Sequence, residues 1–69
     1  MDFAEIRKRF TYHPPKKGQP EIYEDIRAKA LEFAELLYWH CPDSNESAEA
    51  IKKVEMAVMW ANAAIARHG

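Results

Sequence analysis

The 69-residue sequence has few of the features by which small proteins usually hold their folds together. It contains one cysteine, Cys41, which excludes an intramolecular disulfide, and no Cys/His spacing typical of a structural zinc site. A chain of this length buries only ~60% of the surface that its unfolded form exposes, so a monomer would be marginally stable. Self-association is the remaining means of stabilisation.

Long hydrophobic runs are also absent. No stretch approaches the roughly 20 apolar residues that a membrane-spanning helix needs, so we expect no membrane partner. Residues 2–9 are rich in charge, whereas a signal peptide needs an uninterrupted apolar stretch. With a single cysteine, this indicates a cytosolic protein. No glycine-rich phosphate loop, Ser/His/Asp set or inward-facing carboxylate pair is recognisable, so we expect neither enzymatic activity nor a cofactor.

The formal net charge of −1 is unevenly distributed. Residues 1–20 carry five basic and two acidic side chains (+3), residues 21–50 two basic and eight acidic (−6), and residues 51–69 three basic and one acidic (+2). Proteins that track a long nucleic acid need an extended basic surface, which the acidic middle segment interrupts. A compact anion with one to three phosphates, bound at one basic and aromatic place, remains compatible with this charge pattern.

Apolar periodicity predicts an all-α single domain over residues 1–69, in which an N-terminal arm precedes a two-helix antiparallel hairpin. Pro20 suits the first turn of a helix, and Cys41-Pro42 ends it. Either Asp43 with Glu46 or Ser44 with Ser47 could cap the next helix. The expected elements are a short helix at 2–11, a connector at 12–19, and helices at 20–40 and 45–67.

The two long helices differ in how much of their surface is apolar. The first has a single apolar stripe with 4-4-3-4-4 spacing, and the second has a 3-4-3-4 stripe together with apolar residues on its other sides. Other copies of the chain would have to cover that second helix, so we expect a homo-oligomer assembled through residues 54–66. The alternative is a monomer with loosely covered Met59 and Trp60. The stripes are Ile22, Ile26, Ala30, Phe33, Leu37 and Cys41, and Ile51, Val54, Val58, Ala61 and Ile65.

The segment FTYHPP, residues 10–15, is the most distinctive local feature of the sequence. A ring such as Tyr12, held by stiff prolines, could stack on a planar base, while Arg27 emerging from an apolar strip of the next helix could contact phosphate. This arrangement would be a nucleotide clamp. On the residues alone, two alternatives stay open: Tyr12 and Pro14 could pack the arm onto the hairpin, and Arg27 could pair with Glu24 or a neighbouring subunit.

The three histidines and Cys41 do not form a recognisable metal-binding pattern. Adjacent His40 and Cys41 have weak spacing for a shared ion, and His13 and His68 are not organised around them. We therefore expect no metal.

Several spaced strings resemble one known family. They are FTYHPP, then Gln19-Pro20 with Tyr23, Ile26 and Arg27, and VMWANAAIA at 58–66. Together they resemble the small phage proteins that counter CBASS immunity by sequestering cyclic oligonucleotides, whose hairpin module also occurs in sponges directed at Thoeris signals. The likeness extends from about Phe10 to Ala66.

The resemblance implies a helical, symmetric hexamer in the cytoplasm of the infected bacterium. Such a protein binds cyclic dinucleotides such as 3′,3′-cGAMP between subunits without cleaving them, and some relatives also bind cyclic trinucleotides. The matching ligand-binding positions are Tyr12 and Arg27, with His13, Pro14, Phe10 and Lys16 nearby; Asn62 and Arg67 are candidates for a second site.

A rival from another class is a small helical oligomeric module that inhibits or regulates a host protein. In that case the apolar face of residues 54–66 would dock on the host protein.

Overall fold

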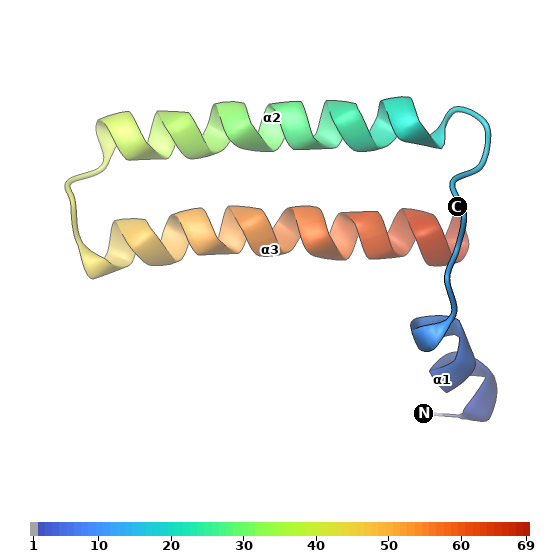
Figure 1. The fold of residues 1–69 in the computed structure, drawn as a ribbon. Helices are drawn as coiled ribbons and strands as arrows, with labels where there is room; N and C mark the ends of the chain where they lie inside the picture. Colours follow the sequence, from blue (N-terminus) through green and yellow to red (C-terminus); the bar gives the residue numbers. More distant parts are fainter. Residues whose placement is uncertain (1) are drawn as a thin grey trace.

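The computed structural model describes residues 2–69, which form three helices and no strand. α1 spans Phe3–Phe10, α2 spans Gln19–His40 and α3 spans Asn45–His68. The helices α2 and α3 lie side by side in opposite directions, and α1 projects from the end of the hairpin where α2 begins and α3 ends (Figure 1). The predicted all-helical hairpin with an N-terminal arm is confirmed.

Local chemistry accounts for the start of each of the first two helices. Asp2 caps α1, because its Oδ1 accepts a hydrogen bond from the backbone N–H of Glu5 at 2.8 Å. α2 follows Gly18, whose φ of 85° lies in the left-handed region that favours glycine. Pro20 then lies in the first turn of α2, where a missing N–H removes no helical hydrogen bond.

The turn between the long helices is held by a pair of serines. The backbone N–H of Ser47 donates to Ser44 Oγ, and the backbone N–H of Ser44 donates to Ser47 Oγ, each at 3.1 Å. This reciprocal capping box begins α3. Of the two capping pairs that the sequence left open, the structure has Ser44 with Ser47.

The contact between α2 and α3 follows the predicted stripes, with one difference. All five stripe residues of α3 are half-buried, whereas on α2 Ile22 and Phe33 remain 48% and 52% exposed. Each residue advances about 100° around a helix, so the 4-4-3-4-4 spacing puts Ile22 and Phe33 together at one margin of the stripe. The seam is shifted towards the opposite margin, and its half-buried residues are Tyr23, Ile26, Ala30, Ala34, Leu37 and Cys41.

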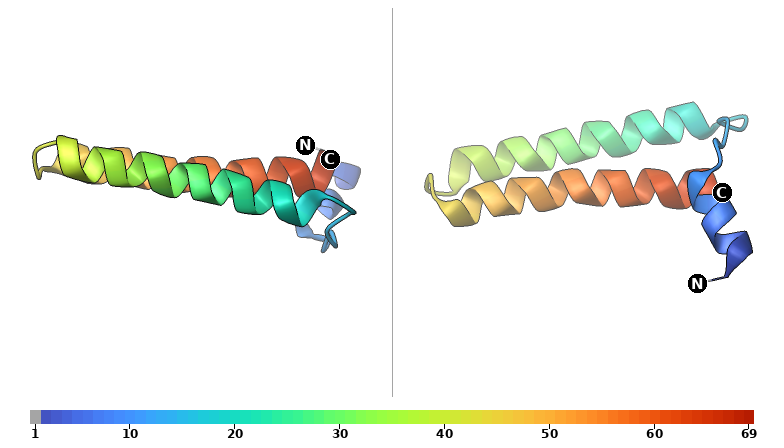
Figure 2. Two further views of the ribbon diagram at one scale, coloured as in Figure 1. Left: turned by 90° about the horizontal axis from the view of Figure 1, so that it is seen from above. Right: turned by 60° about the horizontal axis from the view of Figure 1, so that its bottom comes forward.

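Residues 2–69 form a single layer without an apolar core. The radius of gyration is 15.2 Å, against about 11 Å expected for a compact domain of this length. The overall dimensions are 44 × 29 × 12 Å, and the smallest of these is about the diameter of one helix with its side chains (Figure 2). Within residues 2–69 no apolar side chain is buried, and Gln19 is the one buried residue, at 8% exposure. None of the helices there is long and apolar enough to cross a membrane.

Polar contacts fasten the arm and the connector to the end of α3. Gln19 Oε1 accepts from the backbone N–H of Lys16 at 2.8 Å, and Gln19 Nε2 donates to the carbonyl oxygen of Ile65 at 3.4 Å. Lys16 Nζ donates to the carbonyl oxygen of Gly69 at 2.6 Å. Gln19 is therefore buried because it joins the connector to both long helices.

Candidate functional site

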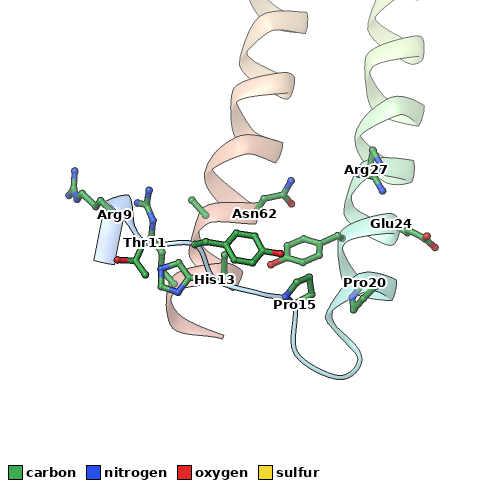
Figure 3. A pocket seen from close by; sticks show the side chains of 13 residues that line it. Arg9, Thr11, His13, Pro15, Pro20, Glu24, Arg27 and Asn62 are labelled. Carbon is green, nitrogen blue, oxygen red and sulfur yellow. The ribbon is translucent and has the colours of Figure 1, made fainter. Parts of the chain in front are cut away.

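A hollow of about 630 Å³ lies where the connector crosses the first turns of α2 and the last turns of α3. Its volume falls within the ~300 to 1,000 Å³ typical of small-molecule sites. Side chains from the arm, α2 and α3 surround it, and Arg9 and Arg27 lie on opposite sides (Figure 3). The lining residues are Arg9, Thr11, Tyr12, His13, Pro15, Pro20, Tyr23, Glu24, Arg27, Asn62, Ala63, Ala66 and Arg67.

Tyr12 lines this hollow and remains 79% exposed. An aromatic ring that packed the arm onto the hairpin would be largely covered, and Pro14 is exposed as well. Within one chain, the structure therefore does not support the interpretation of Tyr12 and Pro14 as packing residues. The ring is available as a stacking surface for a planar ligand.

Positive charge dominates the hollow, with three guanidinium groups against the single carboxylate of Glu24. Arg9 Nε pairs with Glu5 Oε1 at 3.2 Å. The side chains of Arg27 and Arg67 form no hydrogen bond or ion pair with any residue in 2–69, so the alternative pairing of Arg27 with Glu24 is not formed. Figure 3 shows Glu24 directed away from the middle of the hollow. Two arginines are thus available for an anion.

His13 holds the connector in place beside the hollow. Its Nε2 donates to the carbonyl oxygen of Lys8 at 2.8 Å, which links the connector to α1. Thr11 Oγ1 likewise donates to the carbonyl oxygen of Arg7. Lys8 Nζ in turn donates to His68 Nδ1 at 3.2 Å, so α1 also contacts the end of α3. These contacts fix the backbone on either side of Tyr12.

The structure brings some of the predicted site residues together and separates others. Tyr12, His13 and Arg27 line the hollow, whereas Phe10, Pro14 and Lys16 do not. Phe10 is 87% exposed at the end of α1, and the Lys16 ammonium group is held at Gly69. Asn62 and Arg67, predicted as candidates for a second site, lie in the same hollow as Tyr12.

Sequence reasoning had not assigned several of the lining residues to a site. Tyr23 was part of the string that carried the family resemblance, and its position one turn before Arg27 on α2 was a usable signal. Arg9 precedes the FTYHPP segment and Thr11 belongs to it, but their participation depends on the path of the connector. Ala63 and Ala66 offer no chemical signal and contribute only space.

The described residues include no cluster of three or more potential metal-binding side chains. His40 and Cys41 lie at the end of α2, at the other end of the hairpin from His13 and His68 (Figure 1).

The fold and site together define a small helical hairpin that presents an aromatic ring and free guanidinium groups at one end. Comparison with known families places this chain more narrowly: residues 3–66 match the Acb2/Tad1 hairpin domain, so the chain belongs to that family of anti-CBASS and anti-Thoeris sponges. Comparison with curated proteins and with solved structures gave no match. The predicted family resemblance is confirmed over nearly the whole chain.

Proposed function

We propose that this protein is a phage sponge that binds and sequesters cyclic oligonucleotide signals, and so blocks activation of CBASS effectors in the cytoplasm of the infected bacterium. The observation that carries the proposal is the hollow at Tyr12, in which an exposed ring lies with the free arginines Arg27 and Arg67. Membership of the Acb2/Tad1 hairpin family supports it. Cyclic dinucleotides such as 3′,3′-cGAMP are the primary ligands, and cyclic trinucleotides are further candidates.

The ligand would be held by stacking and by charge. A base stacks on Tyr12, worth ~1 to 3 kcal/mol, and its phosphates contact the guanidinium groups. A cyclic dinucleotide carries two negative charges, which match the excess of two positive charges among the lining residues, counted as three arginines against Glu24.

The protein acts without catalysis in this proposal. Both Thr11 Oγ1 and His13 Nε2 donate their hydrogens to backbone carbonyl oxygens, so neither is arranged as part of a nucleophile–base pair. A sponge that does not turn over its ligand needs high affinity and stoichiometric amounts.

Self-association is the second part of the proposal. The chain is one helix thick, and both faces of the hairpin have apolar grooves, one lined by Phe33 and Ala57 and the other by Leu31 and Met59. Met59 and Trp60 are 63% and 65% exposed. Interfaces of obligate oligomers resemble a domain core cut in half, as these faces do. A symmetric hexamer, assembled through residues 54–66, would cover them.

Titration calorimetry tests the ligand assignment. The purified protein is titrated with cyclic dinucleotides, cyclic trinucleotides and cyclic ADP-ribose isomers, and linear dinucleotides serve as controls. After denaturation the bound ligand should be recovered chemically intact. Cleaved ligand in molar excess over the protein would instead indicate an enzyme. The absence of a heat signal with every compound would refute the proposed binding of cyclic nucleotide signals.

Sedimentation of the same sample separates the sponge from the rival, a module that docks on a host protein. The proposal requires a stable oligomer. A monomer that still blocks a host protein would favour the rival.

A further inference from the structure

Asn62 has the one unpartnered buried side-chain polar atom in the part of the chain that the structure describes. Its Oδ1 is shielded from solvent and accepts no hydrogen bond from residues 2–69. The residue lies on α3 among the walls of the hollow, and it is half-buried. Buried polar groups in proteins are nearly always hydrogen-bonded, so an exception at a candidate ligand site calls for a physical reason.

This acceptor is in an unfavourable state, because it is shielded from water and accepts from no donor within residues 2–69. The terminal torsion of an asparagine is soft and roughly two-fold, so the amide can turn and exchange the positions of its oxygen and nitrogen. Turning Oδ1 towards the hollow would improve its energy only if something there donated a hydrogen. The neighbouring Ala63 and Ala66 side chains have no donor, and none of the hydroxyl or guanidinium groups that line the hollow donates to Oδ1. A ligand in the hollow could supply the missing donor.

The chemistry of Oδ1 restricts which part of a nucleotide it can face. Phosphate oxygens are acceptors with negative charge, so they would repel Oδ1 and favour the guanidinium groups of Arg27 and Arg67. The donors of an adenine nucleotide are the exocyclic amine of its base and the 2′-hydroxyl of its ribose, and a guanine nucleotide adds the N1–H of its ring. A carboxamide also has the geometry to pair with the edge of a purine, donating and accepting at once.

We propose that Asn62 is a specificity-determining residue of this site, whose Oδ1 accepts a hydrogen bond from the nucleoside part of the ligand. The inference rests on the proposed function, and it adds the reason why the site prefers one cyclic nucleotide over another. A ligand without the matching donor would enter the hollow and leave the buried acceptor unpaired, and sites of this kind reject such analogues more strongly than apolar sites do.

The test combines a protein change with a ligand change. The change Asn62→Leu removes the acceptor while nearly conserving volume, and Asn45→Leu, at the start of α3 and away from the hollow, is the matched control. The probe is whichever of 3′,3′-cyclic di-AMP and 3′,3′-cyclic di-GMP binds the wild type more tightly. One analogue of that probe lacks the amine on each base and one lacks the 2′-hydroxyls; for the guanine probe, a third carries a methyl group in place of each N1 hydrogen. Each combination is measured by calorimetry, and assembly size by sedimentation.

For the wild type, removal of the donor that pairs with Asn62 should weaken binding about 10-fold, as loss of one buried hydrogen bond does. Asn62→Leu should bind the parent probe about 10-fold more weakly and should no longer distinguish it from that analogue. The analogue that Asn62→Leu no longer distinguishes from the parent probe identifies the ligand group that donates to Oδ1. The Asn45→Leu variant should behave as the wild type.

Four results would overturn the proposal. Equal binding of the parent probe by the wild type and Asn62→Leu would show that Oδ1 contacts no ligand donor. If Asn62→Leu still distinguished every analogue from the parent probe as the wild type does, another group would be responsible for the discrimination. If the assembly of Asn62→Leu were smaller, the Asn62 amide would lie at an interface between copies. Absence of binding by the wild type to both probes and to 3′,3′-cGAMP would refute both this inference and the proposed binding of cyclic dinucleotides, whereas the other results leave the proposed function standing.

Discussion

The substitution Tyr12→Ala separates the role of this ring in ligand binding from any role in folding. The side chain is 79% exposed, so about a fifth of it is covered within the chain. Full burial of a large apolar side chain stabilises by ~1.5 to 3 kcal/mol, and a fifth of that is roughly 0.3 to 0.6 kcal/mol. Stacking of one base on an aromatic ring is worth ~1 to 3 kcal/mol, which corresponds to a change in Kd of about 5- to 150-fold.

We therefore expect Tyr12→Ala to lose binding of a cyclic dinucleotide while its helicity, thermal midpoint and assembly size stay close to those of the wild type. Calorimetry gives the Kd, and circular dichroism with sedimentation gives the other quantities. Tyr12→Phe should retain most of the affinity because it keeps the ring. Phe3→Ala is the matched control, since Phe3 is 74% exposed on α1 and does not line the hollow. If Tyr12→Ala dissociated the assembly while the subunits still bound ligand, the ring would be an interface residue and the stacking argument would be wrong.

Three further substitutions test other parts of the proposal. Ala61→Glu puts a charge on a half-buried position of the apolar seam, where an unpaired charge costs several kcal/mol; an unchanged sedimentation coefficient would contradict the assignment of that face. Arg27→Ala should weaken binding and make the affinity less dependent on salt concentration, which calorimetry at several ionic strengths measures. Lys52→Ala changes a residue outside the hollow and should leave this salt dependence unchanged. Gln19→Ala removes two hydrogen bonds of the connector, each worth ~0.5 to 1.5 kcal/mol. The connector should therefore exchange its amide hydrogens faster, and ligand affinity should fall about 5- to 10-fold. If the variant exchanged these hydrogens at the wild-type rate, the other contacts would be sufficient to hold the connector.

Much of the fold follows from patterns that act over short distances. The ends of the long helices were predictable within one residue, because Pro20 and the Cys41-Pro42 step restrict the backbone locally. The choice between the two capping pairs was not predictable, because Asp43 and Ser44 are both good cap residues. A helix has one N-cap residue, so capping by Ser44 excludes capping by Asp43. The left-handed turn at Gly18 was likewise missed, because glycine permits this conformation without requiring it.

The site was less predictable than the fold, because its residues are close in space and distant in sequence. Tyr12 and Arg27 had chemistry that could be recognised from their neighbours in the chain. Their position beside Asn62 depends on the contacts of the buried Gln19. These contacts could not be predicted from the sequence, because a glutamine before a proline is ordinary at the start of a helix. The same contacts and the Lys16–Gly69 hydrogen bond turn Lys16 away from the hollow, although its charge alone made it a candidate.

The absence of an apolar core within residues 2–69 bears directly on how so short a protein could hold a ligand firmly. A clamp is effective when its groups are fixed before the ligand arrives, because ordering a loose ring or arm would consume part of the binding free energy. Here the connector is anchored to α3, and α3 is only half covered by α2. Covering α3 with other copies, as we propose, would therefore stiffen the element on which the hollow is built. On this reasoning the apolar residues at 54–66 contribute to affinity without contacting the ligand, and a variant that loosens the assembly should bind more weakly even when Tyr12 and Arg27 are intact.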